Sequence, residues 1–394
     1  MSNDKQPEIR FPGFTEDWEQ RKLGEVVERV TRKNKKLESI RPLTISAQEG
    51  LIDQNEFFNK TVASRDVSGY YLVKKGEFAY NKSYSNGYPW GAVKRLNQYD
   101  MGVLSTLYIV FKPKKIDSDF LEKYYDTTYW YKEVSKHAAE GARNHGLLNI
   151  AASDFFETEI VMPLKIEEQQ KIGAFFKQLD DTIALHQRKL DLLKETKKGF
   201  LQKMFPKNGA KVPEIRFPGF TEDWEERRLQ EVVDRYDNLR IPITASKRVA
   251  GNTPYYGANG IQGYVEGYTH DGEFILVAED GANDLKNYPV QYVDGKVWVN
   301  NHAHVIQAKE NLADNMFLMN AIRSINIEPF LVGGGRAKLN ADVLMKLEVI
   351  IPLKSEQQKI GNFFKQLDDT ITLHQRKLDL LKEMKKGFLQ KMFV

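Results

Sequence analysis

The chain has 394 residues, more than one hydrophobic core usually organises, so we expect two or more domains. Its 41% hydrophobic and 28% charged residues exclude a disordered or fibrous protein, and with no membrane-length apolar run or signal-peptide core we expect it in the cytoplasm, away from membranes. The absence of cysteine excludes disulfides and thiol chemistry, while a net charge of +4 permits a polyanionic partner without requiring one.

A thirteen-residue motif near the N-terminus occurs twice. Pro7–Glu19 reads PEIRFPGFTEDWE, and Pro213–Glu225 repeats it without a change. A 37-residue block is also repeated, as 169–205 and 357–393, with differences at three positions only. The stretches between these blocks, 28–162 and 234–351, look almost unrelated. Near-identical segments around divergent contents indicate one task performed twice on two targets.

The two variable regions each have the length of an ordinary domain. Turn signals bound strand-like runs, such as Val103–Phe111 and Val297–Ile306, and helical patterns cover Asp119–Lys136 and Asn311–Ile325. This mixture predicts an α+β fold with domains of α/β type.

The repeated block predicts a long helix. No proline occurs from Glu167 to Met204, and apolar residues recur at alternating steps of four and three. Histidine fills one position of this seam in each copy. The predicted seam is Ile172, Phe176, Leu179, Ile183, His186, Leu190 and Leu193, and in the second copy Ile360, Phe364, Leu367, Ile371, His374, Leu378 and Leu381.

A single exposed helix with such a stripe needs a partner. The twin helix is the nearest one, and if both domains dock alike the two helices lie antiparallel about a pseudo-two-fold axis. His186 and His374 lie near the helix midpoints, so this pairing brings them together. The alternatives are that each helix packs on its own domain, or that two chains dimerise.

The variable regions can be registered on each other. Gly76-Glu77-Phe78 matches Gly272-Glu273-Phe274, and the same offset of 196 places Ser105 on Asn301. A Leu-Asn pair follows in each half, at Leu148-Asn149 and Leu339-Asn340. The loops at matching places differ in chemistry, which is typical of recognition surfaces on a shared scaffold.

The start RFPGFTEDW, the runs EFAYNKS and GVLSTLYIVF, the strand VNNHAHV and the helix end KKGFLQKMF resemble the DNA-specificity subunit of type I restriction–modification systems. The resemblance covers essentially the whole chain. It implies target recognition domains at 1–162 and 207–351, joined by conserved spacer helices at 163–206 and 352–394.

The resemblance also implies a function and partners. The chain would be a non-catalytic subunit that reads a bipartite site in double-stranded DNA. Two methylase (modification) subunits would methylate adenine N6, and two restriction (motor/nuclease) subunits would complete the complex. S-adenosylmethionine, ATP and Mg²⁺ would then be bound by those partners, with no cofactor or metal in this chain.

Base reading needs side chains with paired donors and acceptors, and phosphate binding needs cations. We expect about half of the candidates to touch DNA. In the first domain they are Asn81, Lys82, Ser83, Tyr84, Asn86, Tyr88, Lys94, Arg95, Arg143, Asn144 and His145; in the second they are Tyr255, Tyr256, Asn259, His270, Asn283, Lys286, Asn301, His302, Arg336 and Lys338.

Rival interpretations have weaker signals. The sequence has neither the Asn/Asp-Pro-Pro-aromatic motif of an adenine methyltransferase nor a GxxxxGK[ST] phosphate loop. Asp284-Leu285-Lys286 resembles part of a nuclease triad, but such a triplet arises often by chance. His302 and His304 share one strand face without a third metal ligand in sight. A coiled-coil scaffold with two protein-binding domains remains the alternative function.

Overall fold

The computed structural model describes residues 6–46, 48–60, 62–83, 87–138, 148, 150–207, 209–333 and 337–394. Their contacts divide the chain into two compact units. Unit 1 comprises Met1–Leu185 with Leu378–Val394, and unit 2 comprises His186–Lys377. Each unit therefore contains one variable region and parts of both long helices. Within the described ranges, no helix is long and apolar enough to cross a membrane.

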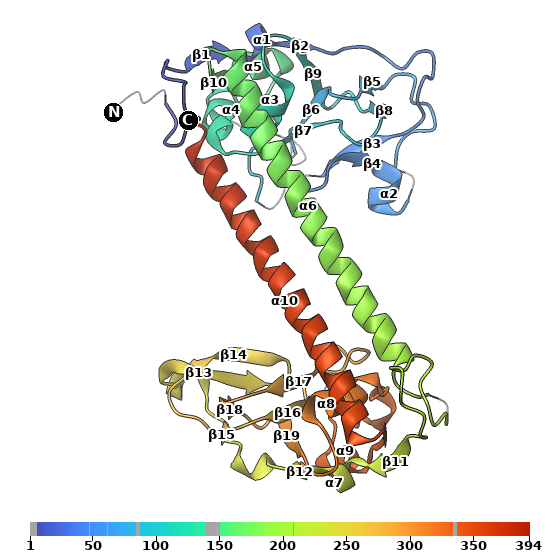
Figure 1. Cartoon of the computed structure of the whole chain (residues 1–394). Helices are drawn as coiled ribbons and strands as arrows, with labels where there is room; N and C mark the ends of the chain where they lie inside the picture. The colour runs from blue at the N-terminus through green and yellow to red at the C-terminus, as the bar shows by residue number, and fades with distance from the viewer. Residues whose placement is uncertain are drawn as a thin grey trace. The chain divides into compact units, whose positions relative to one another are not determined.

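The centre of unit 1 is a four-stranded antiparallel sheet in the order β2-β9-β6-β7 (Figure 1). Because side chains alternate along a strand, Phe78 and Tyr80 of β6 pack with the helices, while Ala79 packs with the β3–β4 hairpin. The strands are β1 (Glu19–Lys22), β2 (Val27–Arg29), β3 (Leu43–Ser46), β4 (Gly50–Asp53), β5 (Tyr71–Lys74), β6 (Phe78–Asn81), β7 (Ala92–Arg95), β8 (Met101–Leu104), β9 (Ile109–Pro113) and β10 (Glu159–Met162). The helices are α1 (Leu23–Val26), α2 (Gln54–Phe58), α3 (Ser118–Tyr125), α4 (Tyr129–His137) and α5 (Ala152–Glu157).

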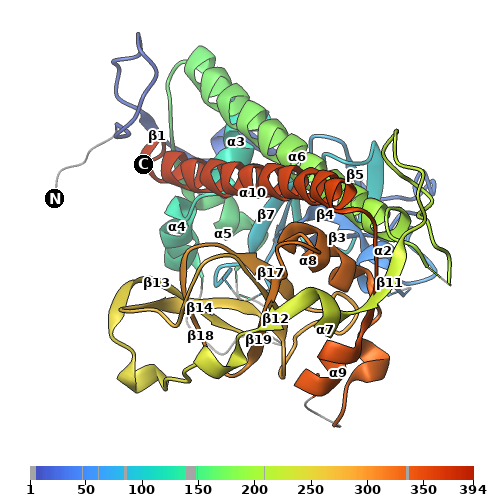
Figure 2. The same cartoon turned by 60° about the horizontal axis from the view of Figure 1, so that its bottom comes forward.

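Unit 2 repeats this sheet in the order β12-β19-β16-β17, and a second sheet has the order β14-β13-β18-β15 (Figure 1; Figure 2 turns this unit forward). Ile275 and Val277 of β16 pack in the cluster that holds α8, whereas Phe274 and Leu276 pack with β18 of the second sheet. The strands are β11 (Glu225–Arg228), β12 (Val233–Arg235), β13 (Ala250–Gly257), β14 (Gly260–Val265), β15 (His270–Asp271), β16 (Phe274–Ala278), β17 (Val290–Val293), β18 (Lys296–Val299), β19 (Ala303–Ala308) and β20 (Glu348–Ile351). The helices are α7 (Leu229–Val232), α8 (Asn315–Ser324) and α9 (Ala341–Lys346), with short 3-10 turns at Asp237–Leu239, Ala245–Lys247 and Glu328–Phe330.

The relatedness of the two variable regions is confirmed by strand pairing, but the offset of 196 is wrong by one residue within the central sheet. Phe78 faces Phe111 across β6 and β9, and Ile275 faces Ile306 across β16 and β19; both pairs lie on the sheet face that packs with the helices, which gives offsets of 197 and 195. The mixed fold with two related domains is confirmed as well. One sheet architecture therefore carries both sets of candidate loops.

The repeated thirteen-residue motif clamps the first turn of a long helix in each unit. Arg10 Nε and Nη2 donate to the two carboxylate oxygens of Glu168 at 2.6 and 2.8 Å. Arg216 makes the same two-pronged contact with Glu356, at 2.8 Å for both bonds. We call these two contacts the arginine clamps. Each motif then enters a strand that pairs with the strand before the helix, β1 with β10 and β11 with β20.

The last turn of a long helix also joins each of these cores. In unit 1 the Ile9 amide donates to Lys391 O at 2.9 Å, and in unit 2 the Ile215 amide donates to Lys203 O at 2.9 Å. The next phenylalanine is buried each time: Phe393 with Trp18 and Phe120, and Phe205 with Trp224 and Phe317. The repeated residues thus make repeated contacts in the two units.

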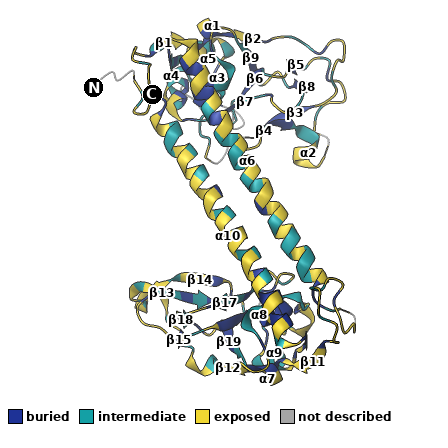
Figure 3. Cartoon of the chain, viewed as in Figure 1, coloured by how far each residue is buried: buried dark blue, intermediate teal, exposed yellow. Residues whose placement is uncertain are grey.

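The two long helices, α6 (Ile166–Lys203) and α10 (Lys354–Lys391), run antiparallel where they meet within a unit. In unit 1 Phe175 lies beside Phe388, and Asp180 pairs with Lys385 at 2.7 Å. In unit 2 Lys197 pairs with Asp368 at 2.5 Å. The predicted seam residues are all buried or half-buried, and Figure 3 shows exposed residues on the other helix faces.

Four predicted elements were wrong in their extent. Val103–Phe111 is divided between β8 and β9, and Val297–Ile306 between β18 and β19, so each run passes from one sheet to another. Asp119–Lys136 forms two helices, α3 and α4, because Thr127 Oγ1 bonds Tyr124 O where the first one ends. The helix predicted over Asn311–Ile325 begins only at Asn315, because Asp314 caps it by accepting from the Phe317 amide.

Candidate nucleic-acid interface

In both units a polar loop follows the central strand and is fastened to a distant segment. The Leu148 amide donates to Lys82 O after β6 at 3.0 Å, and the Leu339 amide donates to Glu279 O after β16 at 2.7 Å. These are the two leucines that the sequence registration had matched. Each unit therefore brings its two candidate loop segments together at the end of the central strand.

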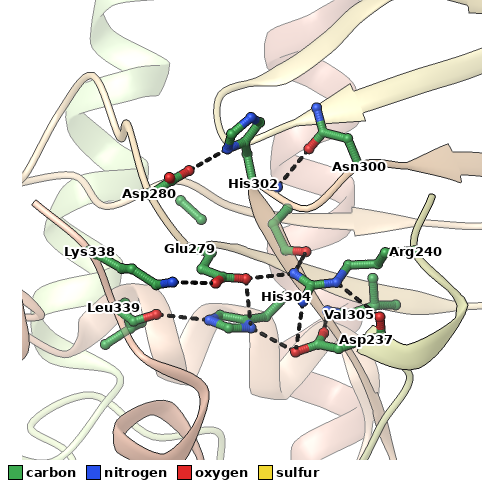
Figure 4. A network of polar contacts seen from close by, with 12 residues as sticks. Asp237, Arg240, Glu279, Asp280, Asn300, His302, His304, Val305, Lys338 and Leu339 are labelled. Carbon is green, nitrogen blue, oxygen red and sulfur yellow. Dashed lines mark hydrogen bonds and ion pairs between the residues drawn. The ribbon is translucent and has the colours of Figure 1, made fainter. Parts of the chain in front are cut away.

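In unit 2 a buried ionic network holds this junction (Figure 4). Arg240 Nη1 donates to Glu279 Oε2 at 2.7 Å and to Ala303 O at 2.8 Å, and Lys338 Nζ lies 2.9 Å from Glu279 Oε1. Burial alone would raise the pKa of Glu279, but the bonds from Arg240 and Lys338 outweigh it and lower that pKa. The carboxylate of Glu279 is thus held ionised between two cations.

His304 lies at the bottom of this network, with 1% of its side chain exposed. Its Nδ1 is 2.8 Å from Asp237 Oδ2, and its Nε2 is 2.9 Å from Leu339 O. Both partners are acceptors, so both ring nitrogens carry hydrogen when both bonds are made. Burial would raise the pKa of Asp237, but the bonds from His304 and the Val305 amide lower it instead. Sequence reasoning missed this network, since Asp237 and Arg240 stand in a polar stretch with no recognisable motif.

Other candidates of unit 2 lie on the loops beside the network. Asn259 Nδ2 donates to Gly281 O at 2.8 Å, and its Oδ1 accepts from the Asn283 amide at 2.9 Å. His302 Nδ1 lies 2.5 Å from Asp280 Oδ1, while Asn301 is exposed in the preceding turn. Asn259, Asn283 and His302 are therefore all tied to the loop that contains Asp280.

Tyr255 and His270 are placed in the core. Their exposed fractions are 1% and 2%, and Tyr256 is half-buried in the cluster between the sheets. His270 Nε2 lies 3.1 Å from Tyr236 O, and burial lowers the pKa of this imidazole. In this conformation Tyr255 and His270 have no surface with which to touch DNA.

The nuclease-like and metal-like patterns have structural roles. The carboxylate of Asp284 accepts from the amides of Lys286 and Asn287 and from the Asn287 side chain, an arrangement that lowers its pKa and forms a turn. Lys286 is exposed on that turn. Among the residues that the structure describes, no group of three or more His, Cys, Asp or Glu side chains could hold a metal ion.

In unit 1 several candidates are tied to the domain itself. Asn81 Oδ1 accepts from the Ser83 amide at 3.0 Å, and Lys82 Nζ donates to Ile150 O at 3.3 Å. Lys94 pairs with Asp126 at 3.0 Å. Arg95 pairs with both Asp119 and Glu122 at 2.7 Å.

Tyr88, Lys94 and Arg95 line a groove of about 780 Å³ in unit 1. Lys382 and Lys386, near the end of α10, line the same groove. Six candidates lie outside the described residues, namely Tyr84, Asn86, Arg143, Asn144, His145 and Arg336.

The fold and these loop edges define a binding protein with two recognition domains on one duplicated scaffold. The family model described as type I restriction modification DNA specificity domain matches residues 15–195 and 221–383. The chain belongs to this family.

Individual relatives agree with the family. A putative type I restriction enzyme specificity subunit of Haemophilus influenzae is 47% identical over 154 residues, which cover 39% of each chain. The MjaVIII specificity subunit of Methanocaldococcus jannaschii is 20% identical over 315 residues, covering 73% of this chain and 72% of the relative. The crystal structure of an S subunit from M. genitalium has the same fold, with a TM-score of 0.67, 15% identity and 99% coverage of both chains.

Proposed function

We propose that this chain is the specificity subunit of a type I restriction–modification complex and that each recognition domain reads one half of a bipartite site in double-stranded DNA. The observation that carries the proposal is the duplicated scaffold. Both domains present a loop after the central strand, fastened by the matched leucine, but the loop chemistry differs completely between them. One scaffold with two unlike loop sets is suited to two unlike half-sites.

The partners follow from the family. Two methylase subunits would flip and methylate one adenine in each half-site, because a base inside the stack cannot be reached, and two restriction subunits would complete the complex. S-adenosylmethionine, ATP and Mg²⁺ would be bound by those partners, and this chain would act in the cytoplasm as a non-catalytic subunit. A solved chain from work on complex assembly of a type I R-M system shares the fold, with a TM-score of 0.51 and 16% identity.

The outer faces of the long helices support docking of two identical partners. Leu185 and Leu192 of α6 lie seven residues apart, hence on one helix face, and their exposed fractions are 60% and 61%. The equivalent Leu373 and Leu380 of α10 are 65% and 61% exposed. Exposed leucines at heptad spacing are typical of a helix that receives another helix. We assign them to the two methylase subunits.

The long helices would also set the gap between the half-sites. A helix of 38 residues at 1.5 Å per residue measures roughly 57 Å, which corresponds to about 17 base pairs of duplex. Because the helix ends are embedded in the domains, we expect the two half-sites to lie about one helical turn of DNA apart.

Genome-wide mapping of N6-methyladenine tests the proposal. Cells that carry active methylase partners are compared with and without this gene. A new bipartite motif with a fixed gap is the expected result. If no motif appears although the partners are active, the scaffold function is favoured; binding to its partners should then be only weakly sensitive to salt, whereas binding to DNA phosphates weakens steeply as salt rises.

A further inference from the structure

The ionic network of unit 2 joins four backbone segments that are distant in sequence. Asp237 follows β12, Glu279 follows β16, His304 is in β19, and Lys338–Leu339 precede α9. Leu339 is held twice, because its amide donates to Glu279 O and its carbonyl accepts from His304 Nε2. The segments that converge here are those that carry the candidate loops of the second domain.

Both candidate loops depend on Glu279. It is the first residue after β16, so it starts the loop that includes Asn283, and its carboxylate holds Lys338 at the end of the other loop. The side chains of Glu279 and Arg240 are 14% and 15% exposed, so their bonds lie in a region of low dielectric, where they are strong. The ammonium of Lys338 is paired with Glu279 at 2.9 Å, although 44% of the Lys338 side chain is exposed.

The first domain has no equivalent network among its described residues. Lys82 stands where the second domain has Glu279, since each of these carbonyls accepts from the matched leucine amide, and strand pairing places Ile109 where the second domain has His304. The contribution of the network is therefore specific to one recognition domain.

We propose that Glu279, His304 and Lys338 are positioning residues for the second half-site: they fix the geometry of the base-reading loops, and Lys338 acts through Glu279 rather than through a DNA phosphate. This inference rests on the proposed function. Side chains that read bases must be held to a fraction of an ångström, and a satisfied buried network is a means of doing so in a loop.

The test uses the full chain assembled with its methylase partners and a duplex that carries the motif found by methylation mapping. Two further duplexes have either the first or the second half-site scrambled. The variants are Lys338→Met, which removes the ion pair, and Lys338→Arg, which keeps it. Asn320→Ala is the matched control, because it deletes a buried hydrogen bond to Met316 O on α8, away from the loops.

We expect Lys338→Met to reduce discrimination at the second half-site by about tenfold, comparable to one misread base pair, with discrimination at the first half-site unchanged. Lys338→Arg should keep the discrimination of the unmodified complex at the second half-site, and so should Asn320→Ala. The slope of log affinity against log salt should stay the same. Glu279→Gln should give the same pattern as Lys338→Met.

A slope reduced by about 0.9, with an equal loss on all three duplexes, would show that Lys338 contacts a phosphate and would overturn the inference. Unchanged discrimination with Lys338→Met would overturn it as well. Failure of the unmodified complex to discriminate any of the duplexes counts instead against the proposed function.

Discussion

The Nδ1 atoms of His186 and His374 lie 3.3 Å apart, and their ring centroids are 5.5 Å apart. This contact confirms the prediction made from the position of both residues near their helix midpoints. A hydrogen bond between two Nδ1 atoms needs one hydrogen and one lone pair, so it is lost when both rings are protonated. The pair therefore links the pairing of α6 and α10 in unit 2 to proton concentration.

We predict that acid weakens this helix pairing. Partial burial lowers the pKa of His186, and the charges of Lys377 and His374 lower it further. A folded-state pKa below the unfolded value means that the unfolded chain binds the proton more tightly. The contribution of His186 to the free energy of unfolding is thus complete above pH about 6.5 and is lost as the pH falls through the lowered pKa.

Thermal unfolding at about pH 7.5 and about pH 5.5 checks this prediction. The double variant His186→Leu/His374→Leu keeps an apolar seam and should lose less stability in acid than the unmodified chain. Equal losses in both proteins would show that the histidine pair is not the titrating element.

The arginine clamps should contribute strongly to stability. Glu356 has 0% of its side chain exposed, so Arg216→Ala leaves an unpaired buried carboxylate and should lower the free energy of unfolding by about 3 kcal/mol or more. Urea denaturation measures this change. The control is Arg227→Ala, whose partner Glu225 is 68% exposed, so that loss of this solvent-screened pair should change the stability far less. Similar costs for the two variants would contradict a structural role for the clamp.

Two glycines in each long helix should respond oppositely to alanine. A Cβ at Gly361 would lie 2.6 Å from Asp314 Oδ1, and a Cβ at Gly173 would lie 2.6 Å from Asp119 Cβ. Alanine at either position should destabilise by about 1–3 kcal/mol through overpacking. At Gly387 and Gly199 a Cβ meets nothing within 4 Å, so alanine should stabilise by about 0.5–1 kcal/mol. Melting temperatures of the four single variants test whether close packing against the helix is the reason for glycine at 173 and 361.

The spacer proposal predicts the effect of lengthening the helices. Inserting four residues at equivalent points of α6 and α10 adds about 6 Å to each helix and should lengthen the gap in the methylated motif by up to about two base pairs. Both half-sites should stay the same. Methylation mapping gives the gap and both half-site sequences in one experiment. An unchanged gap or a changed half-site would count against the proposal that the long helices set the spacing.

The long helices were predictable because their signal is local and periodic. The predicted helix over Glu167–Met204 differs from α6 by one residue at each end. The short elements were harder. Ser105 accepts from the Tyr108 amide, and Asn300 Oδ1 accepts from the His302 amide, so turns interrupt runs that read as single strands. The polar residues in those runs were the only local sign of a turn.

The site was less predictable because its contacts are tertiary. Lys94 and Arg95 resemble DNA ligands until Asp126 and Glu122, about thirty residues further along, are seen to pair with them. Tyr255 resembles an exposed aromatic, but its side chain is only 1% exposed and the guanidinium of Arg248 lies 4.0 Å from its ring centroid. Residue type shows that a side chain is able to read a base, but only the fold shows whether that side chain already bonds to another part of the protein.

The arginine clamps have a consequence for how such a chain can diversify. The clamp arginines and the helix ends that join each core come from the duplicated segments, and the clamp carboxylates, Glu168 and Glu356, directly precede the repeated helical block; the central sheet and its loops come from the variable regions. Genetic exchange within the identical thirteen residues would therefore transfer a complete recognition domain and leave its contacts with the long helices unchanged. Under the proposed function, such an exchange would change one half-site and leave the helices proposed to dock the partner subunits unchanged.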